Sequence, residues 1–353
     1  MTGETAPGDP LIGIVLVNWN GWRDTVECLE SLLRSSYRAW FVVLVDNGSA
    51  DGSIEKIEAY CAGTHSVETP YVAYDPNSKP IGFERIPAAD AIARATGGPP
   101  MADRSVVLIQ NDRNLGFAEA NNQGTRFALA ARSPEFCLFL NNDTEVDPAL
   151  LHEFVEAAAR HPEAGFFGPK TYYYDHDGRR DVINFAGGSL DLVHGETRHI
   201  GQNEIDRGQH DLEREVDWVE GSCLLARSSL LQRIGLLDPA YFAYFEENDL
   251  ILRGRRAGYT AVYVPGARLW HKVSASSKRS PTKLYYLTRN QFWFVRRYAT
   301  AGERTRFFAW FFGYRLWFLL GIYLIRYLSR PSAGALLRGV RDGLRSLPGH
   351  PAP

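Results

Sequence analysis

The sequence predicts an α/β protein with a mostly parallel sheet and helices on both of its faces. Two apolar runs, residues 11–19 (LIGIVLVNW) and 40–49 (WFVVLVDNGS), have the composition of strands that are buried on both faces. Segments of helical periodicity separate such runs along the chain, which is the order expected of βαβ units. Three of the predicted strands also end in polar clusters, and in sheets of this kind ligands bind beyond the carboxyl ends of the strands.

The expected elements alternate regularly along the chain. A strand over residues 11–19 leads into a helix over residues 23–36, and a strand over residues 40–49 leads into a helix that begins near Asp51. Beyond residue 104 we expect strands over 105–110, 136–141 and 259–265, helices over 117–132 and 148–160, a helix from Asn248, and short strands around Phe166, Phe185 and Val219.

Composition divides the chain into three parts. Residues 1–10 are expected to be disordered, and they lack the basic and apolar regions of a secretion signal. Residues 11–270 form the α/β domain, in which the Pro- and Gly-rich residues 64–104 are an insertion or flap. Residues 271–353 form a basic, aromatic-rich helical tail.

Charge is distributed unevenly between these parts. From Arg268 to the C-terminus there are 16 Lys and Arg residues and two acids, so this segment carries +14 although the whole chain carries −2. Such a basic segment predicts a phosphate-rich or anionic membrane partner. The sequence contains no recognition motif for nucleic acid, so nucleic acid is not expected as a partner.

The tail contains one long apolar run, residues 307–325 (FFAWFFGYRLWFLLGIYLI). Its length just suffices to cross a bilayer, but Arg315 in its middle makes crossing costly. Aromatic residues and flanking arginines suit a helix that lies in the membrane interface. We therefore expect a peripheral position on the cytoplasmic face of a membrane; the alternatives are a helix packed on the main domain and a contact in a homo-oligomer.

The four cysteines are expected to be free and buried. They lie far apart, mostly in apolar surroundings and without CxxC spacing: Cys28, Cys61, Cys137 and Cys223. Buried free thiols are typical of a reducing compartment, which agrees with a cytoplasmic location.

The polar strand ends are NWNG at 18–21, DNGS at 46–49 and NNDTE at 141–145. One polar end is an ordinary turn, but three at one sheet edge favour a ligand site. Asp46 is suited to accept hydrogen bonds from a nucleobase or a sugar hydroxyl, although a turn and helix cap also explains it. The loop over residues 111–124 adds amide groups and a glycine, and it matches neither a GxGxxG loop nor a P-loop.

Asp143 is the strongest metal candidate. A hard divalent ion prefers carboxylate oxygens and keeps water and substrate phosphates as its other ligands, so one protein carboxylate suits a nucleotide-phosphate site. Glu145 is a candidate to assist, and His271 is a candidate second ligand because it follows the last predicted strand. A surface or capping role is the simpler explanation of a single histidine.

Three acids lie at the start of a predicted helix: Glu246, Glu247 and Asp249. Acids at this position stabilise the helix dipole, which is sufficient to explain them. The preceding YFAYF is strongly aromatic, and an apolar wall can raise the pKa of a carboxyl toward the range of a general base.

In their order and spacing, these motifs resemble the family-2 glycosyltransferases of the GT-A fold, and in particular their rhamnosyltransferase-like branch. The matching stretches fall between residues 11 and 300: VNWNG, LESLL, VDNGSADGS, NLGFAEANNQG, LFLNNDTEVDP, GSCLLARSSLL, GLLDPAYFAYFEENDLILRGRRAGY and WHK. The resemblance implies a Rossmann-like sheet and an inverting transfer that depends on Mg²⁺ or Mn²⁺. The donor would be a dTDP- or UDP-linked sugar such as rhamnose, and the acceptor a glycan or lipid-linked sugar of cell-surface polysaccharide synthesis.

The resemblance also implies roles for single residues. The family's DxD motif falls on Asn141–Asn142–Asp143, with Asp143 as the metal-binding acid, and His271 matches a position that often completes the metal site. Glu247 occupies the position of the catalytic base, as Glu where Asp is usual, with Glu246 and Asp249 as alternatives. Asp46 resembles the aspartate that holds a pyrimidine base. The residues expected to bind the donor are Asn18, Asn20, Asp46, Asn114, Gly116, Asn121, Asn141 and Asn142.

Two other classes of protein explain part of the pattern. A sugar-nucleotide pyrophosphorylase would share the sheet and the metal, but it needs a Gly-rich basic loop after the first strand, where this chain has VNWNGWRD. A non-catalytic, membrane-bound interaction module would explain the tail but neither the three polar strand ends nor the acidic cluster.

Overall fold

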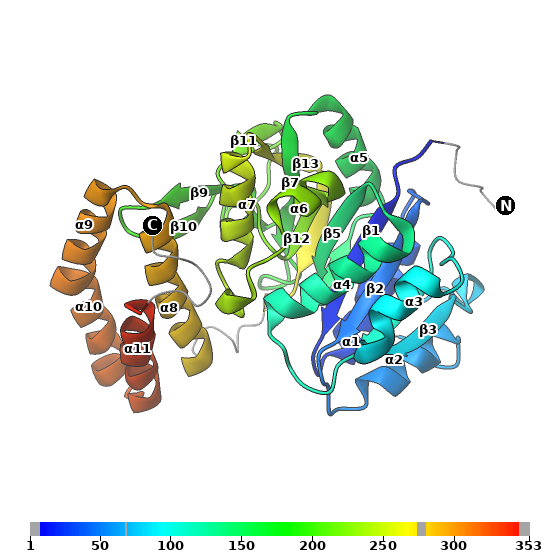
Figure 1. Ribbon diagram of the computed structural model, residues 1–353, viewed down its shortest axis with the longest axis horizontal. Coiled ribbons are helices and arrows are strands. Elements are labelled where there is room, and N and C mark those ends of the chain that lie inside the picture. The colour runs from blue at the N-terminus through cyan, green and yellow to red at the C-terminus, as the bar shows by residue number, and fades with distance from the viewer. Residues whose placement is uncertain (1–7, 68, 274–279, 346–353) are drawn as a thin grey trace.

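The computed structural model describes residues 8–67, 69–273 and 280–345. One large sheet runs through the molecule in the order β11–β13–β7–β12–β5–β1–β2–β4–β3 (Figure 1). The strands are β1 Ile12–Asn18, β2 Trp40–Asp46, β3 Phe83–Pro87, β4 Val106–Gln110, β5 Phe136–Asn141, β7 Ala164–Tyr173, β11 Arg214–Val216, β12 Cys223–Arg227 and β13 Thr260–His271, with β6 Thr144–Val146 and β8 Ile183–Phe185 at the side. The five strands from β5 to β3 are all parallel, whereas β12 is antiparallel to both of its neighbours.

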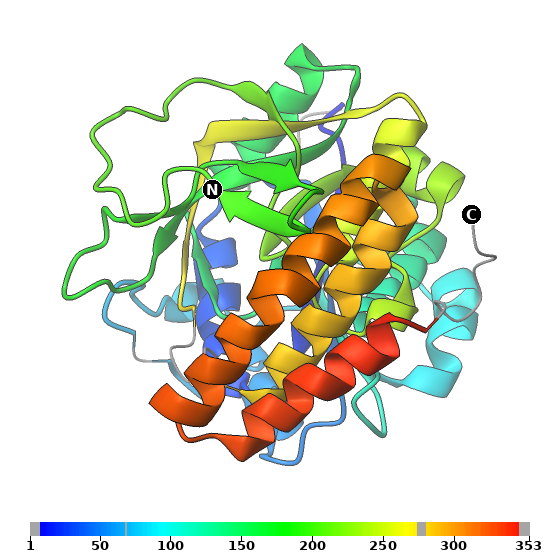
Figure 2. The same cartoon turned by 90° about the vertical axis from the view of Figure 1, so that its left-hand side faces the viewer.

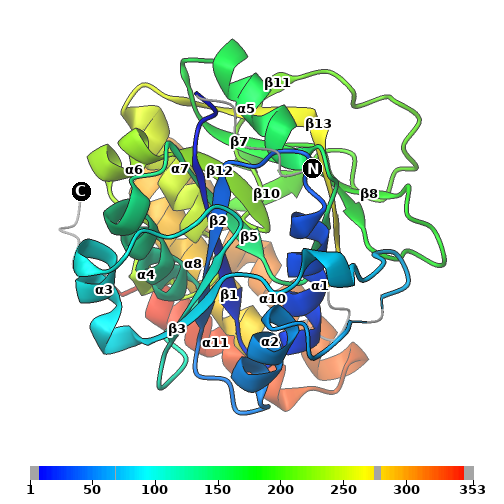
Figure 3. The same cartoon turned by 90° about the vertical axis from the view of Figure 1, so that its right-hand side faces the viewer.

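Helices cover both faces of the sheet (Figure 3). One face carries α1 Trp22–Leu33, α2 Ser53–Cys61 and α5 Leu150–Arg160, and the other carries α3 Ala91–Gly97, α4 Phe117–Arg132, α6 Ser228–Ile234 and α7 Glu246–Arg256. The side chains of β1 alternate between the faces: Ile14 and Leu16 pack toward α1, whereas Val15 packs against Gly124 of α4. The predicted fold class is confirmed.

Two predicted features differ in detail from the structure. The expected strand around Val219 is wrong, because Val219 lies between β11 and β12; its burial comes from packing over Gly168 of β7. Part of residues 64–104, expected as an insertion or flap, forms β3 and α3, and β3 pairs in parallel with β4 as the edge of the sheet. The buried carboxylate of Glu30 anchors this segment by accepting hydrogen bonds from Lys79 and Tyr60.

The C-terminal part forms a helical layer beside the α/β domain (Figure 2). It comprises α8 Pro281–Tyr298, α9 Ala301–Trp310, α10 Leu316–Gly321 and α11 Arg330–Gly343, with π-helical turns over Phe311–Arg315 and Ile322–Arg326. Phe292, Phe307, Phe311 and Leu336 form its core, and the hairpin of β9 Gly188–Asp191 and β10 Glu196–His199 packs beside it. Residues 1–7 of the expected N-terminal segment and residues 274–279 and 346–353 of the tail lie outside the described residues.

Residues 301–326 are the one stretch of helix in the described parts of the chain that is long and apolar enough to cross a membrane, and 11% of its apolar window is buried. Arg315 in its middle lies 3.8 Å from Glu196 of the β9–β10 hairpin. The four cysteines are free and buried, as predicted.

Candidate active site

The polar ends of β1, β2 and β5 meet at one edge of the sheet. Asn18 is in register with Asp46, and Val17 is in register with Asn141, so the three strands end at nearly the same level. The end of β13 reaches the same place, because His271 pairs with Thr144 directly after the β5 turn. The structure thus brings together residues that are separated by more than 250 positions in the chain.

Asp46 organises the loop after β2. Its Oδ1 accepts hydrogen bonds from Asn18 Nδ2 (2.7 Å) and Ser49 Oγ (2.6 Å), and its Oδ2 accepts one from Ser49 N (3.0 Å). Asn20 reaches the same loop, since its Oδ1 accepts a hydrogen bond from Ala50 N (2.8 Å). The second lone pair of Asp46 Oδ2 is therefore the acceptor position left for a ligand.

The loop before α4 is tied to this site through Asn47, which the sequence analysis did not single out. Asn47 Nδ2 donates to Asn114 Oδ1 (3.0 Å), and Asn47 Oδ1 accepts from Leu115 N (2.9 Å). Gly116 has a φ of +86°, and a Cβ atom there would lie 2.5 Å from the ring of Phe242. Asn114 and Gly116 thus lie at the edge of the site, and Gly116 is needed for close packing of this loop.

Asn121, predicted to bind the donor, uses its amide group within its own helix. Its side chain is buried, and its Nδ2 donates to Phe117 O (2.9 Å) within α4.

The turn after β5 holds the predicted metal residue. Asp143 Oδ1 lies 3.2 Å from His271 Nε2, and Asn142 Nδ2 donates to Thr25 Oγ1 (2.9 Å) beside the end of β1. Burial raises the pKa of Asp143, but the adjacent His271 outweighs this effect and holds the pKa below its usual value. Burial likewise lowers the pKa of His271, but Asp143 and then Glu220 outweigh it and raise the pKa.

Asp143 and His271 fit a divalent ion only as part of its ligand set. Among the described residues there is no group of three or more His, Cys, Asp or Glu side chains that could hold a metal. An oxygen and a nitrogen ligand leave the remaining positions to water and to phosphate oxygens, which is how Mg²⁺ and related ions are bound at nucleotide sites. Glu145 is not a third ligand, because its carboxylate accepts a hydrogen bond from Arg180 (2.8 Å).

Glu246 and Glu247 open α7 beside this turn. A Cβ atom at Gly221 would lie 3.6 Å from the side chain of Glu247, so Glu247 rests against the segment that enters β12. That segment is bound to the β5 turn, since Asn141 N donates to Ser222 O (2.8 Å). Burial, together with the nearby Glu220, raises the pKa of Glu247 to about 7. Burial and the adjacent Glu247 raise the pKa of Glu246 well above its usual value.

Buried polar atoms without a hydrogen-bond partner gather in this region. Among the described residues, these atoms include Asn141 Oδ1, Glu220 Oε2, Ser222 Oγ, Glu246 Oε2, Glu247 Oε2, Asn248 Oδ1 and His271 Nδ1. Buried polar groups are almost always paired, so a cluster of unpaired ones indicates a place where a polar ligand completes the bonding.

The structure changes the roles expected of two acids, Asp249 and Glu220. Asp249 is fully buried and committed to structure, because it bonds Arg253 (2.9 Å), Arg297 (2.9 Å) and Tyr298 Oη (2.6 Å). Glu220 was not predicted, yet its Oε1 lies 3.9 Å from His271 Nδ1 and its charge acts on Glu247. Its only signal in the sequence is its position directly before the GSC motif.

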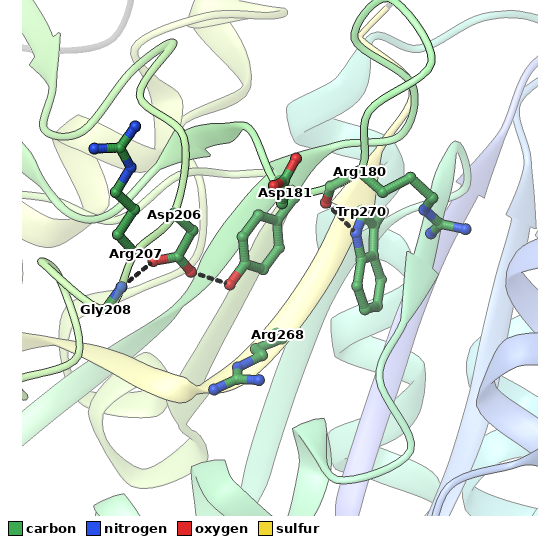
Figure 4. Close-up of a pocket in the computed structure, with 8 residues that line it drawn as sticks. Arg180, Asp181, Asp206, Arg207, Gly208, Arg268 and Trp270 are labelled. Atoms are coloured by element: carbon green, nitrogen blue, oxygen red, sulfur yellow. Dashed lines mark hydrogen bonds between the residues drawn. The ribbon is translucent and has the colours of Figure 1, made fainter.

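A separate cavity of about 360 Å³ contains none of the predicted site residues (Figure 4). It is lined by Tyr172, Arg180, Asp181, Asp206, Arg207, Gly208, Arg268 and Trp270. Trp270 precedes His271, but successive side chains of a strand point to opposite faces, and Trp270 stacks on Tyr172 at 5.7 Å between ring centres. The cavity is therefore distinct from the site at the strand ends.

Comparisons with known proteins identify the family of this chain. The family described as "Glycosyltransferase like family 2" matches residues 7–294. The N-acetylglucosaminyl-diphospho-decaprenol L-rhamnosyltransferase of Mycobacterium tuberculosis is 28% identical over 290 residues, which are 77% of this chain and 79% of that protein.

Two solved structures share the fold. The mannosyltransferase PcManGT from Pyrobaculum calidifontis, in complex with GDP-Man and Mn²⁺, superposes with a TM-score of 0.54 at 14% identity over 95% of this chain and 87% of its own. GalNAc-T7 with UDP, GalNAc and Mn²⁺ superposes with a TM-score of 0.55 at 14% identity over 85% of this chain and 50% of its own, so this chain spans half of that protein. The predicted family and fold are confirmed: the chain belongs to the family-2 glycosyltransferases and has the GT-A fold.

Proposed function

We propose that this glycosyltransferase moves a sugar from a nucleoside diphosphate to a lipid-linked or glycan acceptor, with inversion and with the help of Mg²⁺ or Mn²⁺. The observation that carries the proposal is the meeting of the Asp143–His271 pair at one sheet edge with Glu246 and Glu247, each of which has one buried carboxylate oxygen without a partner. The M. tuberculosis relative is named for an L-rhamnosyl transfer to a diphospho-decaprenol-linked sugar, which supports a rhamnose donor and a lipid-linked acceptor. We propose dTDP or UDP as the nucleotide of that donor.

Each part of the site has a task in this reaction. Asp46 accepts hydrogen bonds from the donor's base, and the Asn47-held loop encloses the nucleoside. Asp143 and His271 would hold a divalent ion, which would supply positive charge to the diphosphate. Glu247 removes the proton from the acceptor hydroxyl, because a pKa of about 7 leaves much of it ionised near neutral pH while keeping it basic.

The bonds change in one displacement. The acceptor oxygen forms a bond to the anomeric carbon while the bond from that carbon to the diphosphate oxygen breaks. The diphosphate leaves with the electron pair, and the acceptor's proton passes to the Glu247 carboxylate. Attack from the face opposite the leaving group inverts the anomeric centre.

Release of nucleoside diphosphate tests the proposal. A panel of dTDP- and UDP-sugars is incubated with an extract of polyprenyl-linked acceptors, with Mn²⁺, with Mg²⁺ or with excess EDTA. We expect turnover of one donor class that EDTA stops, and no turnover by folded Asp143→Ala. Full activity in EDTA or in Asp143→Ala would overturn the metal assignment, and no turnover of any donor would overturn the proposed reaction.

We further propose that the helical tail docks the enzyme on the anionic cytoplasmic leaflet. Large apolar side chains of residues 312–328 are exposed: Phe312, Tyr314, Trp317, Phe318, Leu324, Ile325, Tyr327 and Leu328. The segment from Arg268 onward carries +14 in formal charge, which complements an anionic surface. A lipid-linked acceptor would reach the site from that surface. A homo-oligomer contact through the same side chains is the competing outcome.

A further inference from the structure

The segment that precedes the acidic residues is held in an unfavourable backbone conformation. Phe242, Tyr244 and Phe245 have φ angles of +65°, +70° and +73°. Residues with a Cβ atom avoid this region, and bulky aromatic residues avoid it strongly. Phe245 is also the N-cap of α7, directly before Glu246, so this segment determines where Glu246 and Glu247 lie.

Asn290 of α8 holds the carbonyl groups of this segment. Its Nδ2 donates to Tyr241 O (3.0 Å), Ala243 O (2.8 Å) and Tyr244 O (2.8 Å), and its side chain is completely buried. The neighbouring Arg289 donates from Nη2 to Ala240 O (2.9 Å) and Tyr241 O (2.8 Å). Two adjacent residues of one helix therefore bind four carbonyl groups of this segment, those of Ala240, Tyr241, Ala243 and Tyr244.

The orientation of the Asn290 amide is fixed chemically. Arg289 Nε donates to Asn290 Oδ1 (2.9 Å), and a guanidinium has no acceptor atom. The oxygen of the amide must therefore face Arg289, which leaves both N–H groups of Asn290 for the carbonyls of the segment.

Aromatic packing from α8 completes the contact. Phe242 stacks on Tyr286 with ring centres 4.8 Å apart, and Phe245 packs on Phe294 at 5.2 Å. The position of α8 is in turn set by the rest of the tail, since Trp293 Nε1 donates to Arg345 O (3.2 Å). In Figure 1, α8 lies between α7 and the remaining tail helices.

We propose that Asn290 and Arg289 are positioning residues for the transfer reaction. They hold residues 240–245 in the conformation that keeps Glu247 against Gly221 and beside Glu220. Without these hydrogen bonds, the backbone of the segment relaxes toward ordinary φ angles and the first turn of α7 moves. The inference rests on the proposed function in one respect, namely that Glu247 acts as the base. It gives α8 a role in catalysis that is separate from membrane docking.

The test compares Asn290→Ala with Gln291→Ala. Gln291 is the next residue of α8, and its Nε2 donates to a carbonyl elsewhere, His194 O (2.9 Å), so its loss serves as a matched control. Hydrogen exchange of residues 241–249 and steady-state turnover are measured on the full chain. We expect Asn290→Ala to accelerate exchange in this segment and to lower kcat by about tenfold or more, with nucleotide affinity within about twofold. Gln291→Ala should change neither property.

Each outcome supports or contradicts the positioning role of Asn290. Unchanged exchange in residues 241–249, or accelerated exchange with an unchanged kcat, overturns the positioning role. If Asn290→Ala does not fold, Arg289→Gln at its half-buried position gives the same comparison through the bonds to Ala240 and Tyr241. If the unmodified enzyme turns over no donor, the proposed function is contradicted instead. Hydrogen exchange of residues 241–249 then still shows whether Asn290 holds the segment.

Discussion

Glu247 combines two properties that rarely coexist in a stable protein. Its side chain is half-buried, and its buried Oε2 has no partner among the described residues. A stabilising residue would be paired, as Asp249 is two positions later with Arg253 and Arg297. An acid that keeps one buried oxygen without a partner at a sheet edge is expected to serve chemistry rather than folding.

Substitution separates these two acids. Glu247→Gln should lower kcat by about 10²-fold or more and leave nucleotide affinity unchanged, because only the proton acceptor is lost. Asp249→Asn should instead destabilise the fold by about 3–5 kcal/mol, since two arginines lose a buried counter-charge. Kinetics and thermal unfolding of both variants check this. A larger kcat loss in Asp249→Asn at equal stability would move the role of base to Asp249.

The pH dependence follows from the same carboxyl. Transfer requires ionised Glu247, and its pKa is raised to about 7, so kcat should rise with pH through this value rather than near the usual 4.5. Stability should change in the opposite direction. The raised pKa means that the folded state binds the proton more tightly than the unfolded chain, so this group destabilises the fold as pH rises from about 4.5 to about 7. Glu247→Gln should therefore raise the melting temperature at pH 8 more than at pH 5.

The sequence predicted where the site lies better than which side chains form it. Strand ends are readable from apolar runs, and they located Asp46, Asn141 and Asp143 at the correct edge. The direction of a side chain on a helix depends on packing, so Asn121 was predicted in the site although it bonds its own helix. Glu220 was missed because its relation to His271 arises from tertiary contact alone.

At the scale of elements, the loop before α4 and the aromatic segment before α7 form one packed unit. Phe117 N and Ala118 N at the start of α4 donate to Phe242 O, so the aromatic segment satisfies helix-terminal donors that have no partner inside the helix. The ring of Phe242 fills the space where a side chain at Gly116 would lie. The loop proposed to enclose the nucleoside and the segment before the acids of α7 are therefore joined through one aromatic residue, Phe242.

Gly116→Ala tests this coupling, with Gly178→Ala as its control. Both glycines have a positive φ, +86° and +80°, so both substitutions strain the backbone, and the ψ of 166° at Gly116 adds strain there because that region is essentially reserved for glycine. Only at Gly116 does the new Cβ also meet an atom, at 2.5 Å, whereas nothing lies within 4 Å at Gly178. We expect Gly116→Ala alone to weaken nucleotide binding and lower kcat. Equal effects of the two variants in calorimetry and kinetics would contradict this.

The boundaries of helices and strands were predictable where the apolar residues follow one clear pattern along the chain. Buried parallel strands and the long α4 match their expected ranges because their patterns are local. The edge strand β3 (FERIP) has neither alternation nor an apolar run, and it becomes a strand by pairing with β4. Val219 is the opposite case: its apolar side chain predicts a strand, but the residue is buried in a loop.

On the scale of the whole molecule, charge and apolar surface are segregated. The 267 residues before Arg268 carry −16 and the remainder carries +14, so a basic C-terminal segment follows an acidic domain. Its helices bury Phe307, Phe311 and Leu316 inward and leave other large apolar side chains on the outside. Monomeric soluble proteins rarely expose contiguous patches of this kind, which are typical of partner or membrane surfaces.

Ile325→Glu tests the membrane proposal, and Leu212→Glu is its control. Both side chains are 79% exposed, but Leu212 lies on the α/β domain before β11 and Ile325 on the tail. Burying an isoleucine in the interface contributes about 2 kcal/mol, so its replacement by an acid should weaken binding by more than about tenfold. In co-sedimentation with anionic vesicles we expect the unmodified enzyme and Leu212→Glu to pellet, less at high salt, and Ile325→Glu to remain in solution. The membrane proposal is wrong if all three proteins remain in solution at low salt. If the unmodified chain then also elutes as an oligomer that Ile325→Glu dissociates, the exposed apolar surface is a contact between copies of this chain.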